Sequence, residues 1–495
     1  MVNFIRIQDK DNVVVALTDI KAGETINVDG RSLSVSTDIP RGHKIAVQKI
    51  SKDEDVIKYG LPIGYASQDI EAGNHVHIHN VKTKLSGTDE YAYIQRLLDI
   101  DIMKDNRMFM GYKRENGSVG IRNELWIIPT VGCVNGIGQM ISDTFKRKSD
   151  TLLIDNIEVY KHNFGCSQLG DDHENTKRIL IDLVKHPNCG GALVLGLGCE
   201  NNQVTEFKEA LDGFDERRVK FLTAQEVEDE VEAGVRLLGE LYEAMKCDRR
   251  EETPISELKV GLKCGGSDGL SGITANPLLG YFSDYLITQG GTSVLTEVPE
   301  MFGSETILME RARDQETFSK IVRLINDFKD YFTANNQPVY ENPSPGNKSG
   351  GITTLEDKSL GCTQKAGRSK VVDVLNYGET LTEKGLNLLS APGNDLVAST
   401  ALAASGCQMV LFTTGRGTPF GTFVPTVKIS SNTEIYNKKK NWIDFNAGVL
   451  IEDKSMDEVL EGFISYIIEV ASGKLVNNEK NKFREITIFK TGVTL

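Results

Sequence analysis

Three segments of the chain repeat one pattern: ELWIIPTVGC (124–133), IEVYKHNFGC (157–166) and GALVLGLGC (191–199). Each is an apolar run of the kind that forms a buried strand, and each ends at a glycine followed by a cysteine. A segment with helical spacing follows each run, and the three cysteines stand 33 residues apart. Repeated strand–helix units imply a parallel sheet covered by helices. Sites in such sheets gather at the carboxyl ends of the strands, so the pattern favours an enzyme.

The segments on either side differ from each other: the N-terminal one has β-type runs only, and the C-terminal one continues the α/β pattern. The turn motif D-I-x-x-G occurs at Asp19, Asp38 and Asp69, next to β-type runs such as HKIAVQKI. The C-terminal half is rich in glycine loops, including CGGSDGLSG and TTGRGTPFG. We therefore predict an α/β protein whose two α/β regions have mainly parallel sheets. The expected units are a small all-β domain (1–86), a polar and partly helical connector (87–122), an α/β domain (123–255) and a second α/β domain (256–495).

Composition narrows the class of protein. The chain has 495 residues and a net charge of −14, which argues against nucleic acid as a partner because binding phosphates takes lysine and arginine. The first residues lack the apolar run of a signal peptide, and no stretch approaches the ~20 apolar residues of a membrane helix. Eight cysteines without a secretion signal favour reduced thiols. We expect a cytoplasmic protein without a membrane partner.

Three histidines lie within HVHIHN: His75, His77 and His79. On a strand, alternate residues face one side, so the three imidazoles would share a face. Histidine is the commonest metal ligand in proteins. We predict that His75 and His77 contact a metal or the substrate, and His79 is a further candidate. The alternative is a polar strand that faces solvent.

Seven of the eight cysteines adjoin a glycine, and only Cys247 does not. Cys133, Cys166 and Cys199 could hold an iron–sulfur cluster only if their strands are adjacent, and the sequence does not give the strand order. No C-x-x-C pair occurs, so we expect no cluster and a colourless protein. Cys133, whose loop opens a helix, is the cysteine predicted to be a metal ligand or an acid–base group. GCVNGIG departs from G-x-G-x-x-G, so NAD is not expected.

Cationic residues in glycine loops are candidates for binding an anionic substrate. The stretch 346–367 carries Lys348, Lys358 and Lys365, and TTGRGTPFG carries Arg416 and Thr418. A lysine in a closed loop can bind a carboxylate or act as an acid–base group, and an arginine can hold a carboxylate through two nitrogens. The alternative for each is a solvated charged loop. The candidates are catalytic Lys365 and substrate-binding Arg114, Arg122, Asn135, Lys348, Arg416 and Thr418.

Long strings along the whole chain resemble the altronate/galactarate dehydratase family of sugar-acid hydro-lyases. They are GYKRENGSVGIRNELWIIPTVGCVNG (111–136), KCGGSDGLSGITANPLLG (263–280), GNKSGGITTLEDKSLG (346–361) and TTGRGTPFG (413–421). The first eighty residues resemble the SAF (β-clip) domain that precedes these enzymes. The length and LGCTQKAG fit the altronate branch better than the galactarate branch.

The resemblance implies removal of water from D-altronate, giving 2-dehydro-3-deoxy-D-gluconate in hexuronate catabolism, with Fe(II) or Mn(II) as cofactor and a homodimer as the expected assembly. A divalent metal can stabilise the enediolate that forms when a base takes the proton next to the carboxylate. Three alternatives remain open: a galactarate or other 2-hydroxy-acid lyase, an iron–sulfur hydro-lyase, and a sugar-acid binding protein without activity.

Overall fold

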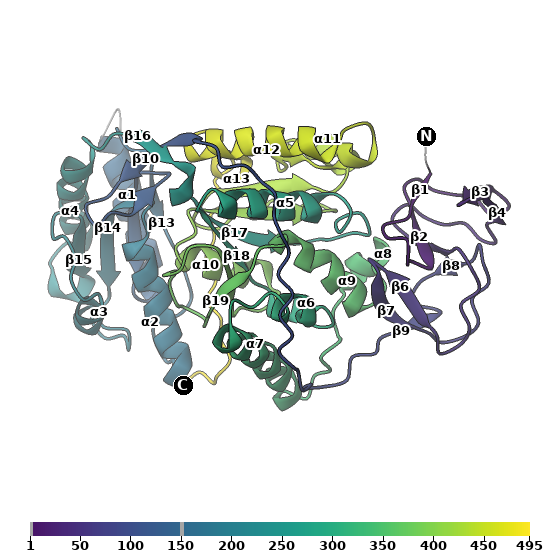
Figure 1. Ribbon diagram of the computed structural model, residues 1–495. Helices are drawn as coiled ribbons and strands as arrows, with labels where there is room; N and C mark the ends of the chain where they lie inside the picture. The colour runs from purple at the N-terminus through teal and green to yellow at the C-terminus, as the bar shows by residue number, and fades with distance from the viewer. Residues whose placement is uncertain (1–2, 149–152) are drawn as a thin grey trace.

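A computed structural model describes residues 3–148 and 153–495. The N-terminal part is all β (Figure 1). Its three antiparallel sheets have the orders β1-β2-β5-β8, β3-β4 and β6-β7-β9. The strands are β1 (Phe4–Ile5), β2 (Val13–Ala16), β3 (Thr25–Val28), β4 (Arg31–Ser34), β5 (Lys44–Ala46), β6 (Asp55–Lys58), β7 (Leu61–Ala66), β8 (His75–Val76) and β9 (Val81–Lys82).

The D-I-x-x-G repeats form equivalent turns in this domain. Their isoleucines Ile20 and Ile39 pair with each other, and Ile70 pairs with Ile50. HVHIHN is not the continuous strand that the alternation predicts. The strand ends at Val76, and the backbone turns so that the N–H groups of Asn80 and Val81 both donate to the carbonyl of His77.

The connector has no helix, contrary to the expectation of a partly helical segment. Residues 83–107 form neither helix nor strand and cross the surface of the C-terminal domain (Figure 1). Tyr91 donates to Glu305 at 2.7 Å and Gln95 donates to the carbonyl of Ala312 at 2.9 Å. These bonds to the C-terminal domain hold an extended chain in place. The boundaries of the expected domains stay a prediction.

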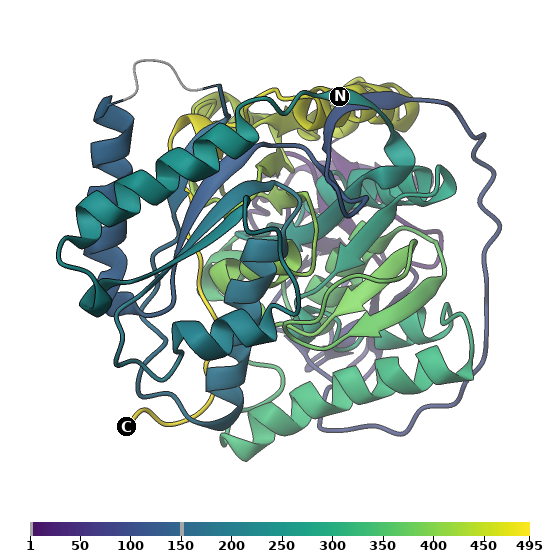
Figure 2. The ribbon, with the colours of Figure 1, turned by 90° about the vertical axis from the view of Figure 1, so that its left-hand side faces the viewer.

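The second region has a four-stranded parallel sheet in the order β13-β12-β14-β15. Helices α1 and α4 pack together over β12 to β15 (Figure 2). Helix α2 contacts α10 (Asp395–Ala404) of the next region. Its elements are β12 (Glu124–Pro129), α1 (Asn135–Lys148), β13 (Asn156–Val159), α2 (Gly170–Lys185), β14 (Cys189–Gly196), α3 (Val204–Ala210), β15 (Val219–Thr223) and α4 (Glu230–Met245). A small sheet, β11-β10-β16, flanks it, with β10 (Met108–Lys113), β11 (Val119–Gly120) and β16 (Glu251–Pro254).

The C-terminal region holds a seven-stranded parallel sheet in the order β19-β20-β18-β17-β21-β22-β23. Its strands are β17 (Lys259–Cys264), β18 (Thr292–Leu295), β19 (Val371–Leu375), β20 (Leu386–Leu389), β21 (Met409–Thr414), β22 (Thr426–Ser430) and β23 (Phe445–Asn446). Along the chain, β17 to β20 form one side of the sheet, and β21 to β23 are then added on the other side, next to β17. The point between them is the topological switch point, where open α/β sheets bind their ligands.

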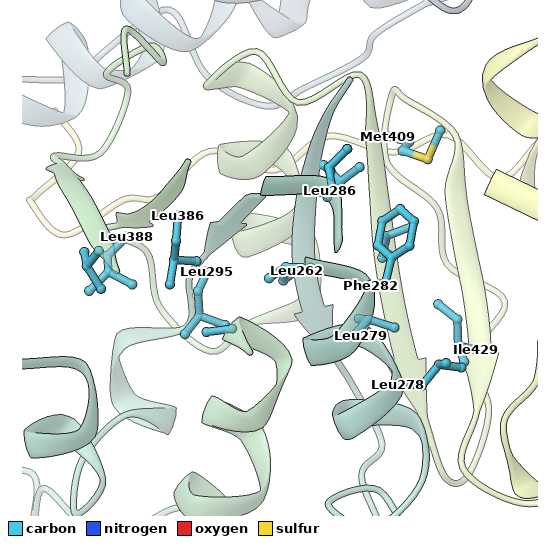
Figure 3. Packing of buried hydrophobic residues seen from close by; sticks show 14 of the residues in the cluster. Leu262, Leu278, Leu279, Phe282, Leu286, Leu295, Leu386, Leu388, Met409 and Ile429 are labelled. Atoms are coloured by element: carbon cyan, nitrogen blue, oxygen red, sulfur yellow. The ribbon is translucent and has the colours of Figure 1, made fainter. Parts of the chain in front are cut away.

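Apolar helix faces cover this sheet. Leu278, Leu279 and Phe282 of α5 pack beside Leu262 and Ile429 of the strands (Figure 3). The helices of the region are α5 (Ala275–Thr288), α6 (Glu305–Met309), α7 (Gln315–Ala334), α8 (Pro345–Ser349), α9 (Leu355–Cys362), α10 (Asp395–Ala404), α11 (Thr433–Lys438), α12 (Met456–Ala471) and α13 (Asn477–Lys480). Among the helices that the structure describes, none has the length and apolarity to cross a membrane.

Candidate active site

A cavity of about 510 Å³ opens at the carboxyl ends of β17, β18 and β20, beside the switch point. Drug-sized ligands occupy pockets of about 300–1,000 Å³, so a six-carbon acid fits this volume. The lining mixes charged groups, amides and the glycines of CGGSDG. The residues that matter for the chemistry below are Cys264, Gly265, Glu300, Asn342, Asn347, Lys358 and Asp395.

Three buried lysines and three carboxylates form a balanced charge network at this cavity. Lys263 pairs with Glu297 and, at 2.8 Å, with Asp395. Asp395 lies close because Gly265 has no Cβ: a Cβ there would lie 2.7 Å from both Asp395 oxygens. Lys365 adds a contact to Glu297 at 3.5 Å. Burying this many charges is tolerated only because each has an opposite partner.

Lys358 and Glu300 are the ion pair of this network that faces the cavity, 2.8 Å apart. Burial alone would raise the pKa of Glu300, but attraction to Lys358, Lys365 and Lys263 outweighs it and holds that pKa well below its usual value. Burial likewise opposes protonation of Lys358, but Glu300 raises its pKa above the ordinary value. At pH 7 the pocket therefore presents a carboxylate and an ammonium group.

Two thiols complete the centre. Cys264 lies 3.5 Å from Cys362, 3.0 Å from Glu300 Oε2 and 2.9 Å from the Lys365 ammonium. Cys264, Glu300 and Cys362 each offer one ligand atom, and these three atoms lie within 4.8 Å of one another. Within residues 3–148 and 153–495, this is the group of three His, Cys, Asp or Glu side chains that could hold a metal ion. The bond to Cys264, together with burial, raises the pKa of Cys362 well above that of a free thiol.

The histidines gather on the other side of the glycine loop 346–351. His43 Nδ1 lies 3.0 Å from His75 Nε2, and the rings of His43 and His77 are 4.7 Å apart. His77 Nδ1 lies 3.2 Å from Thr353 Oγ1. Burial lowers the pKa of His75 to about 4 and that of His77 to about 3, so these imidazoles are neutral at pH 7 and their nitrogens can bind metal or accept protons.

Buried ion pairs fix the N-terminal domain against α9. Asp357 binds Lys44 at 2.8 Å and Lys58 at 2.9 Å, and all three side chains are buried. Burial would raise the pKa of Asp357, but the two ammonium groups hold it well below its usual value. Because α9 also carries Lys358, this contact links the histidine domain to the cavity.

Arg416 lies on the outer side of the same loop. It is exposed and donates to Ser349 Oγ at 2.9 Å. With Arg41 and Lys438 it lines a second cavity of about 350 Å³ between the two domains. Lys348 is half-buried in α8, and Thr418 Oγ1 accepts a hydrogen bond from Phe420 N at 3.4 Å. None of these three candidates lines the 510 Å³ cavity.

Arg114 and Arg122 hold the fold together, contrary to the expectation that they bind substrate. Arg122 is fully buried in a two-nitrogen pair with Glu479, at 2.7 and 2.8 Å. Arg114 donates to the carbonyl of Pro187 at 2.8 Å and pairs with Asp248 at 3.2 Å. Their guanidinium donors are taken by the protein.

Cys133 and Asn135 lie at the start of α1, whereas the histidines lie at β8, at the opposite end of the molecule (Figure 1). Cys133 therefore does not join His75 and His77 on one ion within one chain. Asn135 donates to the carbonyl of His162 at 2.7 Å. Of the predicted catalytic residues, Lys365 alone belongs to the charge network at the cavity.

Sequence reasoning missed His43, Glu297, Glu300 and Asp395. The repeat held a signal for His43: it follows DIPRG just as the segment with His75 follows DIEAG, and β5 pairs with β8. Glu297 and Glu300 lie in TEVPE directly after the apolar run of β18. Asp395 ends APGND (391–395), one of the glycine loops of the C-terminal half, and begins α10.

Three family descriptions match the chain in order. They are "Altronate/galactarate dehydratase SAF domain" over residues 2–84, "D-galactarate dehydratase/Altronate hydrolase, second domain" over 111–246, and "D-galactarate/Altronate dehydratase, C-terminal" over 255–494. The N-terminal match agrees with the all-β sheets found there.

Curated relatives match over nearly the whole length. The chain is 64% identical to an altronate dehydratase of Bacillus subtilis, covering 100% of both chains. It is 59% identical to an altronate dehydratase of Escherichia coli, covering 99% of this chain and 100% of the relative. Identity to the galactarate dehydratase (L-threo-forming) of Escherichia coli is 32%, over 95% of this chain and 93% of that one.

Proposed function

The chain belongs to the D-galactarate/altronate dehydratase family, and we propose that it is a hydro-lyase that removes water from altronate to give 2-dehydro-3-deoxy-D-gluconate. Full-length identity to two altronate dehydratases, about twice that to the galactarate enzyme, is the observation that carries this substrate. The whole-length match also disfavours a binding protein without activity. A homodimer and a cytoplasmic location stay predictions from the sequence.

The 510 Å³ cavity is the proposed substrate site, with Asp395 as the base. Its carboxylate lines the cavity beside Gly265 and is held by Lys263. Asp395 takes the C2 proton, and the protonated Lys358 donates a proton to the departing C3 hydroxyl. Asn342 and Asn347 supply amide groups for the substrate hydroxyls. Together these groups balance the protons of a dehydration.

Cys264, Glu300 and Cys362 are the proposed ligands of the divalent metal. Thiolates and a carboxylate suit Fe(II) better than Mn(II), which prefers oxygen ligands. A divalent metal would compete with two ammonium groups: that of Lys365, which contacts Cys264, and that of Lys358, which pairs with Glu300. When bound, such an ion acts as a Lewis acid toward the substrate carboxylate and the charge that develops on it.

The activity is tested with a 2-keto-acid assay, run anaerobically on a panel of hexonates and hexarates with Fe(II), Mn(II) or Mg(II) added separately. We expect product from D-altronate and much less from galactarate. A blank across the panel with Fe(II) and Mn(II) would refute the proposed activity, and a preference for galactarate would refute the proposed substrate.

Metal affinity tests the ligands separately. Glu300→Gln and Cys362→Ser are expected to weaken binding of Fe(II), or of Co(II) as a spectroscopic probe, about 10- to 100-fold or more. Cys407→Ser, which changes a buried cysteine on another face of the sheet, is the matched control and should bind normally. The assignment fails if the ligand variants titrate like wild type.

The histidine prediction is tested by His75→Ala and His77→Ala. Because the two imidazoles are neutral and grouped with His43, we expect each change to lower turnover about 10²-fold or more while the melting temperature hardly moves. His173→Ala, on α2 at the opposite end of the molecule (Figure 1), is the control. If both variants keep wild-type turnover at saturating metal, the group of histidines is only a structural contact.

A further inference from the structure

The strand order of the four-stranded sheet brings the three glycine–cysteine loops together. β12 lies between β13 and β14, all parallel and hydrogen-bonded. Cys133, Cys166 and Cys199 lie in the loops that follow β12, β13 and β14. Since adjacent strands lie about 4.8 Å apart, the three loops that carry these cysteines leave one edge of one sheet side by side.

Backbone hydrogen bonds join the three loops to one another. Gly132 N donates to the carbonyl of Phe164 at 2.9 Å, and Asn202 N donates to the carbonyl of Gly165 at 3.0 Å. Gly132 and Gly165 each directly precede a cysteine of the trio. The cysteines are thus held by a bonded framework rather than by independent loops.

The glycines beside these cysteines are explained by how tightly the loops pack. A Cβ on Gly165, whose φ is +99°, would lie 2.0 Å from the carbonyl oxygen of Thr130. A Cβ on Gly132 would lie 2.7 Å from the carbonyl oxygen of His162. Backbones approach this closely only where side chains are absent, so glycine lets the cysteine loops converge.

All three cysteines are exposed, although cysteine is among the most buried residue types. Two long helices begin at the same edge, α1 after Cys133 and α2 after Cys166. Leu169, at the start of α2, makes no side-chain cap bond. The positive end of a helix dipole attracts anions, so this edge suits a bound group that carries negative charge.

A buried amide donor beside these loops has no partner. Gln168 is 4% exposed, and its Oε1 accepts from Gly165 N at 3.0 Å and from Thr176 Oγ1 at 2.9 Å. Its Nε2 has no hydrogen-bond partner among the residues described. This nearly buried donor next to the Cys166 loop is available to a bound group, and the sulfurs of an iron–sulfur cluster accept such bonds.

We propose that Cys133, Cys166 and Cys199 bind a [4Fe–4S] cluster at this edge, separate from the Cys264–Glu300–Cys362 centre. Two Fe(II), two Fe(III) and four sulfides assemble on three thiolates, whose three protons leave to solvent. Three cysteine ligands leave the fourth iron of the cluster without a ligand from these loops. This reverses the expectation of a colourless protein, which rested on an unknown strand order.

The full-length protein, purified and reconstituted anaerobically with Fe(II), Fe(III) and sulfide, tests the cluster. We expect about four acid-labile sulfide and four to five iron per chain after desalting, because the Cys264–Glu300–Cys362 centre can hold one iron besides the cluster, and we expect broad visible absorption that dithionite bleaches. Protein without acid-labile sulfide would overturn the proposal, as would iron bound with no sulfide.

Single substitutions locate the cluster. Cys133→Ser, Cys166→Ser and Cys199→Ser should each lower bound sulfide several-fold, with circular dichroism confirming that each variant is folded. Cys247→Ser, which changes an exposed cysteine without a glycine neighbour, and Cys264→Ser should retain it. If all three loop variants retain bound sulfide, or if Cys264→Ser alone loses it, the assignment is contradicted. Sulfide content is measured without turnover, so it tests the cluster even if the altronate assay fails.

Discussion

Asp395→Asn is expected to lower the turnover number for altronate dehydration by about 10²–10⁴-fold, the contribution typical of a positioned acid–base group. Asparagine keeps the shape of the side chain and an oxygen for Lys263, but it cannot take a proton from C2. Steady-state kinetics with metal present give the measurement. The Michaelis constant should change much less than turnover, because the substrate contacts remain.

Asp373→Asn is the matched control for this prediction. Asp373 is also a carboxylate paired with a lysine, at 2.9 Å from Lys320, but it lies on β19 at the far edge of the same sheet. Its substitution should leave turnover near the wild-type value. If Asp395→Asn retains more than about a tenth of wild-type turnover, the base is another group.

Arg122→Met is expected to destabilise the protein by about 3–5 kcal/mol, because it leaves a buried carboxylate without its main partner. The guanidinium binds Glu479 through two nitrogens and also donates to the carbonyls of Val470 and Lys474. It therefore joins the start of β12 to the segment after α12. Chemical denaturation followed by circular dichroism measures the loss.

The same variant separates a structural role from substrate binding. At a temperature where Arg122→Met is still folded, its Michaelis constant for altronate should match that of wild type. Arg217→Met, which removes an exposed guanidinium paired with Glu115 and Asp215, should change stability little. A large rise in the Michaelis constant with unchanged stability would restore the role that the sequence suggested for Arg122.

Sequence periodicity predicted the strand–helix units correctly because it reflects local geometry. Apolar runs such as ELWIIPTVGC and GALVLGLGC become buried parallel strands, and helices follow them as their spacing indicates. The same reasoning failed for residues 83–107. There, contacts such as those of Tyr91 and Gln95 to a distant domain decide the conformation, and such partners leave no local pattern.

From the sequence we could predict the family, the all-β N-terminal domain, the grouping of His75 with His77 and the cationic segment that supplies Lys365. We could not predict that Lys365 lies beside Cys264, that Arg122 is buried against Glu479, or that the three glycine–cysteine strands lie side by side. Strand order and buried ion pairs arise from contacts between residues far apart in the chain. Spacing along a sequence records which side of an element a residue faces, but not which element lies opposite.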